Sequence, residues 1–198
     1  MCYIFLMAEP KDCIRTQVYA LCILLAVCGL YAFFRYMVFG EVGLPQVPAY
    51  LLNKVVALAS AASLAVACVW RYRGNEAAQK FWFRSTANLA FVHVLLTLSL
   101  LSPVYYPKFF MTGRLTAAGE LSILAGVLTA LGYFRFHHHS QRRWVTAALL
   151  PAALGLHLAA MGGAGWIAPA AWQGGLPPIS LLAFCCAAIS LCVPSARR

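Results

Sequence analysis

Long apolar runs separated by short polar or glycine- and proline-rich segments form the main pattern of this chain. Six runs stand out, at about residues 17–39, 50–70, 80–105, 115–134, 144–161 and 177–193. Each is near the ~20 residues that a helix needs to cross a bilayer, the last one only if it includes residues 177–180. The pattern predicts an all-α integral membrane protein. We expect a six-helix bundle in one transmembrane domain of residues 17–193, preceded by a segment 1–16 and followed by a tail 194–198.

Composition supports the membrane class. Hydrophobic residues make up 63% of the chain and charged residues only 10%, and the mean hydropathy is +0.78. Soluble domains carry about a quarter of charged residues. The net charge of +10 is spread over the ends of the apolar runs. It therefore indicates contact with membrane lipid and not with nucleic acid.

The basic residues also predict the orientation, because cytoplasmic loops are enriched in lysine and arginine. Four basic residues fall on one side, which we call the outer side: Arg35, Lys54, Lys108 and Arg114. Eleven fall on the side that holds both termini: Lys11, Arg15, Arg71, Arg73, Lys80, Arg84, Arg135, Arg142, Arg143, Arg197 and Arg198. Both termini are therefore expected in the cytoplasm, in a multi-pass protein of the cell (inner) membrane.

Eight cysteines occur without a CxxC motif or regular spacing. Most of them lie in or at the ends of apolar runs. Free cysteine is commonly buried as a small apolar residue, so packing is the favoured interpretation over a disulfide framework or a metal site.

Two histidines lie deep inside apolar runs, His93 in AFVHVLL and His157 in LGLHLAA. An ionisable side chain in the membrane is costly and commonly functional. Each has an alanine three or four residues before it, Ala90 and Ala153, which leaves room beside the imidazole for a flat macrocycle. Their depths differ by about 7 Å at 1.5 Å per residue, which tilt can absorb. We expect them to ligate one haem iron. The alternative is that each is only hydrogen-bonded to a neighbour, and zinc is disfavoured because further ligands are missing at that depth.

Other polar residues have weaker interpretations. The outer cations, Lys108 and Arg114 above all, are candidate partners for haem propionates, or else interfacial side chains that reach for the head groups. Glu120 pairs with Arg114 or another cation, or carries protons or substrate. The run His137, His138 and His139 is most simply a solvated basic loop.

The segments FVHVLL, SPVYYPKFF, QRRW and GLHLAAMG resemble the ferric-reductase-like transmembrane family over about residues 51–193. That family includes six-transmembrane metalloreductases and the haem-binding membrane subunit of the methionine sulfoxide reductase system. The resemblance implies a haem b electron-transfer core in which His93 and His157 are the axial ligands. Two-haem members carry a second histidine thirteen or fourteen residues away on both helices. Here those positions hold Gln79 and Lys80, and Arg143 and Trp144, so one haem towards the outer leaflet is expected.

Trp82 and Trp144 lie near the inner ends of the same two helices. They are belt residues at the membrane interface, or one of them shortens an electron path from an inner donor.

No Rossmann, P-loop or flavin-domain sequence occurs in the chain. Electrons must therefore come from a partner, either a redox protein that brings a flavin or a quinone. A non-haem structural or assembly subunit of a larger membrane complex is the alternative function, and a small DoxX-like protein fits the six runs poorly.

Overall fold

The structure is a computed structural model that describes residues 10–40, 47–138 and 150–193. Helices account for nearly all of this part of the chain, which confirms the all-α prediction. The bounds of the α-helices are α1 Pro10–Phe33, α2 Val47–Tyr72, α3 Glu76–Ser99, α4 Ala117–His138, α5 Leu150–Trp166 and α6 Ile179–Cys192. A short π-helix, η1 Phe34–Val38, continues α1.

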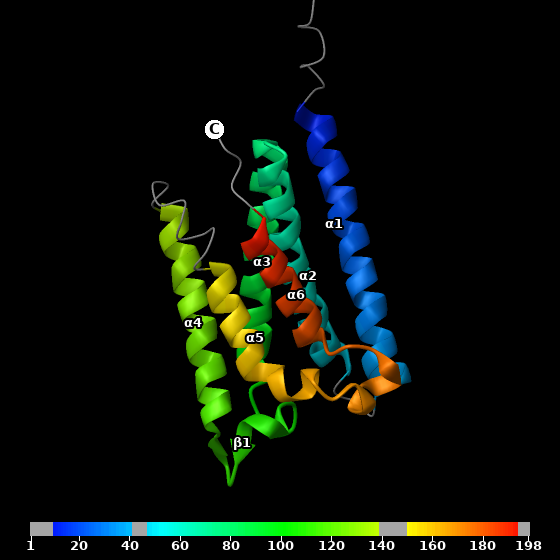
Figure 1. The fold of residues 1–198 in the computed structure, drawn as a ribbon, viewed down its shortest axis with the longest axis vertical. Helices are drawn as coiled ribbons and strands as arrows, with labels where there is room; N and C mark the ends of the chain where they lie inside the picture. Colours follow the sequence, from blue (N-terminus) through cyan, green and yellow to red (C-terminus); the bar gives the residue numbers. More distant parts are fainter. Residues whose placement is uncertain (1–9, 41–46, 139–149, 194–198) are drawn as a thin grey trace, which may run out of the picture.

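Successive helices alternate in direction along one axis, so that α1 begins and α6 ends at the same end of the molecule (Figure 1). We call this the inner end, and the opposite end, where α3 ends and α4 begins, the outer end. The arrangement agrees with the expectation that both termini share one side. Trp144, His139 and both terminal segments lie outside the described residues.

Three helical segments are long and apolar enough to cross a membrane: Ile14–Val38, Val47–Tyr72 and Gln173–Cys192. They correspond to the first, second and sixth apolar runs. The remaining helices contribute shorter apolar stretches among the described residues. The apolar stretch of α3 is short because Glu76, Lys80 and Arg84 occupy the first third of the helix.

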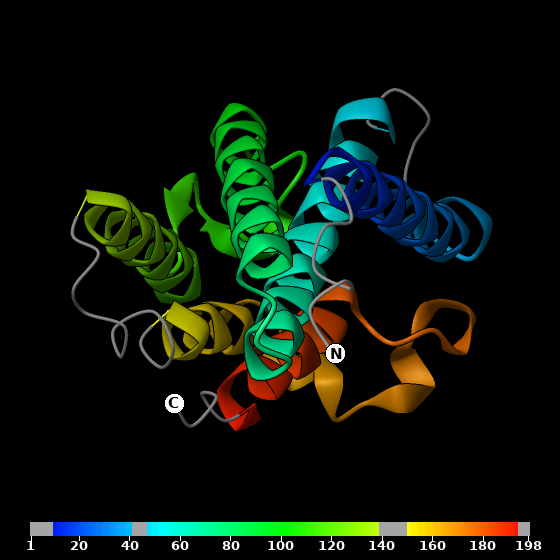
Figure 2. The ribbon, with the colours of Figure 1, turned by 90° about the horizontal axis from the view of Figure 1, so that it is seen from above.

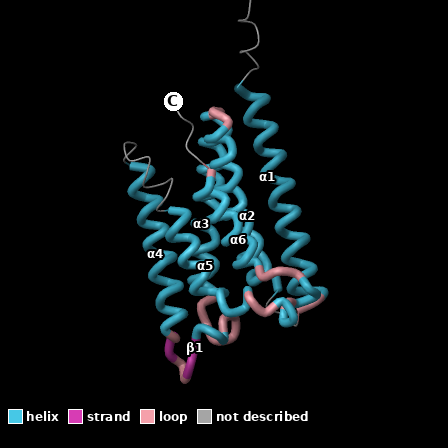
Figure 3. The backbone as a smooth tube through the Cα atoms, in the orientation of Figure 1, coloured by secondary structure: helices cyan, strands magenta, loops and turns pink. Residues whose placement is uncertain are grey.

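The third run ends earlier than predicted. The helix stops at Ser99 instead of continuing to Tyr105, because Pro103 cannot donate a backbone hydrogen bond and disfavours helical geometry in the residue before it. A small hairpin that the sequence analysis did not predict follows, with β1 Phe110–Met111 paired to β2 Arg114–Leu115 (Figure 3). Its turn places Thr112 at φ 51° and Gly113 at φ 78°, the positive φ values that two-residue hairpin turns require.

α2 is the centre of the packing. It lies along α3 and also contacts α1 and α6, while α4 packs on α5 and α5 on α6 (Figure 2). α3 and α5 make little direct contact with each other. The buried face of α2 is rich in alanine and serine, which lets the helix backbones approach closely without a hydrophobic driving force from lipid.

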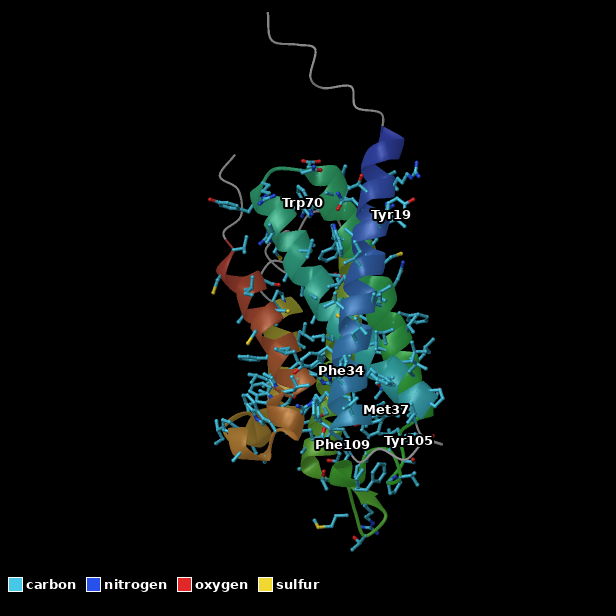
Figure 4. All side chains as sticks on the ribbon, turned by 90° about the vertical axis from the view of Figure 1, so that its right-hand side faces the viewer. Tyr19, Phe34, Met37, Trp70, Tyr105 and Phe109 are labelled. Carbon is cyan, nitrogen blue, oxygen red and sulfur yellow. The ribbon has the colours of Figure 1, made fainter. Side chains whose placement is uncertain are left out.

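Aromatic side chains gather at both ends of the helices. Tyr19 and Trp70 lie towards the inner end, and Tyr105 and Phe109 lie at the outer end (Figure 4). Trp82 does not belong to this belt. It is only 3% exposed, and its indole N–H donates to Gln17 Oε1 on α1 at 2.6 Å. The belt interpretation of Trp82 is therefore wrong, because its polar atom has a partner inside the protein. A part in an electron path stays a prediction.

Gly174 is the glycine whose identity matters most at the outer end. Its φ is +58°, and a Cβ built on it would overlap the ring of Phe39. We expect Gly174→Ala to destabilise the protein by about 1–2 kcal/mol from the backbone strain alone, with a further cost from the overlap. Thermal unfolding in detergent measures this. Gly163→Ala is the matched control, since a Cβ at Gly163 has no neighbour within 4 Å, and a similar loss in both variants would contradict the expectation.

Candidate functional site

His93 lies on α3, six residues before the helix ends, with its side chain partly buried. Its Nδ1 is 2.6 Å from the side-chain oxygen of Asn53 on α2. An amide oxygen only accepts hydrogen bonds, so this contact requires a proton on Nδ1. The second ring nitrogen, Nε2, is then unprotonated and carries the free lone pair.

Asn53 is the most buried polar residue of this region, with no exposed surface. Its oxygen accepts from His93, and its Nδ2 donates to the Tyr106 hydroxyl at 2.6 Å and to Thr97 Oγ1 at 3.1 Å. In the structure the amide oxygen faces His93 and the amide nitrogen faces the two hydroxyls. Asn53, which the sequence analysis did not single out, is the residue that orients His93.

His157 lies near the middle of α5, and its Nδ1 is 2.9 Å from the backbone oxygen of Ser122 on α4. A carbonyl oxygen can accept a second hydrogen bond beside that of its own helix, and it cannot donate one. Nδ1 of His157 therefore carries the proton as well, and Nε2 is again the free nitrogen. The sequence analysis did not single out Ser122.

The structure brings the two histidines within electrostatic range of each other. His93 comes from α3 and His157 from α5. These two helices make little direct contact with each other, and α2, α4 and α6 pack against one or the other of them. Both imidazoles have the same tautomer, with Nδ1–H bonded to a protein oxygen and Nε2 free. This is the usual arrangement of a metal-binding histidine, whose second nitrogen donates to a carbonyl or carboxylate.

Lys54, next to Asn53 on α2, is the cation that acts on His93. Its ammonium lies 4.7 Å from the centroid of the Tyr50 ring and 5.2 Å from that of Tyr106. Burial raises the pKa of the Tyr106 phenol, and hydrogen bonds with Asn53 and Thr97 oppose this rise. Tyr106 is therefore a neutral hydroxyl at physiological pH, and Lys54 supplies the positive charge of the site.

The other predicted cations are placed differently. Arg114 is exposed on β2, and so is Glu120 on α4, which suits surface positions at the outer end. The side chain of Lys108 lies outside the described part of the chain, as do those of His137 and His138. Arg35 is only 6% exposed and donates to the backbone oxygen of Leu176, so it fastens the connection between α5 and α6 to α1.

Within the described residues no group of three or more histidine, cysteine or acidic side chains is placed to hold a metal ion. His93 and His157 could supply two imidazole nitrogens, one from α3 and one from α5. That number suits the iron of a macrocycle that supplies its own four ligands, and it does not suit a tetrahedral zinc ion. Cys28 and Cys68 are buried free thiols, as the packing interpretation predicted, and Cys186 is partly buried, whereas Cys22, Cys185 and Cys192 are exposed.

Comparison of the chain with protein-family models, curated proteins and solved structures gives no match.

Proposed function

We propose that this chain is a six-span membrane protein of ferric-reductase-like type that binds one haem b between His93 and His157 and relays electrons across the bilayer. The observation that carries the proposal is the shared tautomer of the two histidines. Nδ1–H of His93 is bonded to Asn53 and that of His157 to the Ser122 carbonyl, which leaves Nε2 free on both. Packing alone does not require that two imidazoles present the same free nitrogen.

Each residue has a separate task in this proposal. His93 and His157 would ligate the haem iron through Nε2, and Asn53 and the Ser122 carbonyl hold their rings in place. A bound haem b would supply one-electron transfer. The apolar helix faces exclude water, and Lys54 sets the local charge. We infer that a partner redox protein or a quinol delivers electrons at the inner end and that an acceptor takes them at the outer end.

The pyridine haemochrome assay on purified protein tests the proposal directly. We expect the spectrum of haem b with about one haem per chain, because the residues provide one ligand pair. The control is protein expressed with added haem. If that protein is folded and still lacks a Soret band, the proposal is contradicted.

Lys54 provides a second, quantitative prediction. Replacement of Lys54 by glutamine removes a positive charge near the iron, which favours the ferric state and lowers the midpoint potential. At an effective dielectric constant of about 20 the interaction amounts to roughly 1 kcal/mol, or some tens of millivolts for one electron. Redox titration of the Soret band measures the shift. Lys54→Arg should keep the potential, and Arg114→Gln, at an exposed site, should move it much less than Lys54→Gln.

One observation favours the alternative, a non-haem structural or assembly subunit. A cavity of about 310 Å³ lies between α5 and α6. An apolar helix of another membrane subunit could pack against the small residues that line it. The lining of the cavity is apolar: Pro151, Ala152, Gly155, Leu156, Ala159, Phe184, Ala187, Ala188 and Leu191. Stable folding without haem, together with loss of a complex on Gly155→Leu, would support this alternative.

A further inference from the structure

The connection between α5 and α6 has an unusual composition for a segment that leaves a membrane helix. We call residues 167–178 the α5–α6 loop. It contains no charged residue, and none occurs anywhere between Arg143 and Arg197. Another connection at the outer end, between α3 and α4, carries Lys108 and Arg114 and has a polar turn at Thr112. Two segments at the same end of the molecule therefore have opposite polarity.

The loop also satisfies much of its own backbone. Two 3-10 turns, Pro169–Ala171 and Gln173–Gly175, fold it back on itself. The N–H groups of Ala171, Trp172, Gly175 and Leu176 donate to carbonyl oxygens three residues earlier at 3.0 Å. Pro169, Pro177 and Pro178 have no N–H group to satisfy. Four backbone N–H groups of the loop are thus satisfied within it and three of its residues have none, which lowers the cost of contact with an apolar phase.

The indole N–H groups of Trp166, just before the loop, and of Trp172, inside it, both donate hydrogen bonds within the protein. Trp166 Nε1 donates to Ser180 Oγ at 3.0 Å, and its ring lies 4.8 Å from that of Phe184. Trp172 Nε1 donates to the backbone oxygen of Gly165 at 3.0 Å. What remains on the outside is apolar: Ile167 is 87% exposed, and residues 168–171 (APAA) are exposed as well.

The loop lies to the side of the helices. The loop projects laterally from the ends of α5 and α6, beyond the helix packing (Figure 2). Arg35 and Tyr31 donate to the carbonyl oxygens of Leu176 and Pro177, so the loop is tied to the outer end of α1. It is held level with the helix ends and is not extended away from them (Figure 1).

We propose that the α5–α6 loop inserts into the leaflet at the outer end, with Ile167 and Pro169 at the boundary between head groups and acyl chains. Lipid is the occupant that fits, because the surface is continuous with apolar helix faces, lacks charge, and has both indole N–H groups and four backbone N–H groups bonded within the protein. The α3–α4 connection carries Lys108 and Arg114 beside exposed Met111, so we expect it to face water instead.

Cysteine accessibility in proteoliposomes of purified protein and phospholipid tests this proposal without any partner protein. We expect a membrane-impermeant maleimide to modify Ile167→Cys at least tenfold more slowly than Met111→Cys, the matched control at the same end. The unsubstituted chain gives the background from native thiols, and labelling in denaturing detergent shows that each new thiol is intact. Equal rates in the bilayer would overturn the proposal.

Slow labelling alone would also result if the protein itself covered the loop. A phospholipid with a photoreactive group near its glycerol backbone separates the two cases. We expect it to crosslink to the peptide that contains Ile167, as mapped by mass spectrometry, and not to the peptide that contains Met111. Protection of Ile167→Cys without any lipid crosslink would contradict insertion. None of these readouts depends on haem.

Discussion

Replacement of either His93 or His157 by alanine is expected to abolish the low-spin haem b spectrum and to leave most of the protein without haem. In the proposed function each variant removes one of the two imidazoles that would ligate the iron, and the remaining imidazole cannot keep the iron six-coordinate. The absorption spectrum of the purified variant, with the haemochrome assay for stoichiometry, measures the loss. Variants that retain haem should show a five-coordinate, high-spin spectrum.

His139→Ala is the control for this pair. It removes a histidine from the basic run outside the apolar segments, and we expect an unchanged spectrum. Folding must be followed separately, for example by gel filtration and circular dichroism in detergent. An unchanged spectrum in His93→Ala or His157→Ala, with the fold intact, would rule out these residues as ligands, and a chain without haem in the wild type would rule out the proposed function itself.

The second large effect is expected at Asn53. Leucine fits the same volume but cannot accept from His93 or donate to Tyr106, so Asn53→Leu leaves two buried polar groups without partners. Each unsatisfied group costs about 1–3 kcal/mol, and the loss of such an orienting partner typically weakens metal binding 10- to 100-fold. We therefore expect a marked fall of the thermal midpoint and weaker haem retention on titration with a competing haem acceptor.

Ser63→Ala on the same helix is the matched control for Asn53→Leu. Ser63 is also fully buried, and its hydroxyl has no hydrogen-bond partner within the structure. Its removal should cost little stability and leave haem binding unchanged. If Ser63→Ala and Asn53→Leu had the same effect on haem retention, Asn53 would be a packing residue and not the one that orients His93.

Much of the fold follows from local properties of the chain. Runs of apolar residues near the length of a membrane span predict helices, because a backbone in lipid must satisfy its hydrogen bonds within its own segment. The first, second and sixth runs became helices long enough to cross a membrane. The end of α3 depended on a different local property: Pro103 stops the helix before Tyr105, and a hairpin with positive φ values follows.

The site could be predicted only in part. His93 and His157 stand out in the sequence because an ionisable residue in an apolar run is rare. Asn53 and the Ser122 carbonyl do not stand out, since a single asparagine in a helix and a backbone oxygen carry no sequence signal of a partner. Lys54 is one of four outer cations, and nothing in the sequence distinguishes it from Arg114.

The sequence by itself therefore determined the class of this protein, the places of its helices and the two unusual histidines. These depend on hydrophobicity and backbone hydrogen bonding, which are properties of single segments. Only the tertiary structure decided that Asn53 and Ser122 face the histidines, that Lys54 is the nearby charge, and that Trp82 is buried. These depend on how α2 packs against α3, α4 against α5 and α1 against α3, because hydrogen-bond partners and electrostatic neighbours are relations between segments.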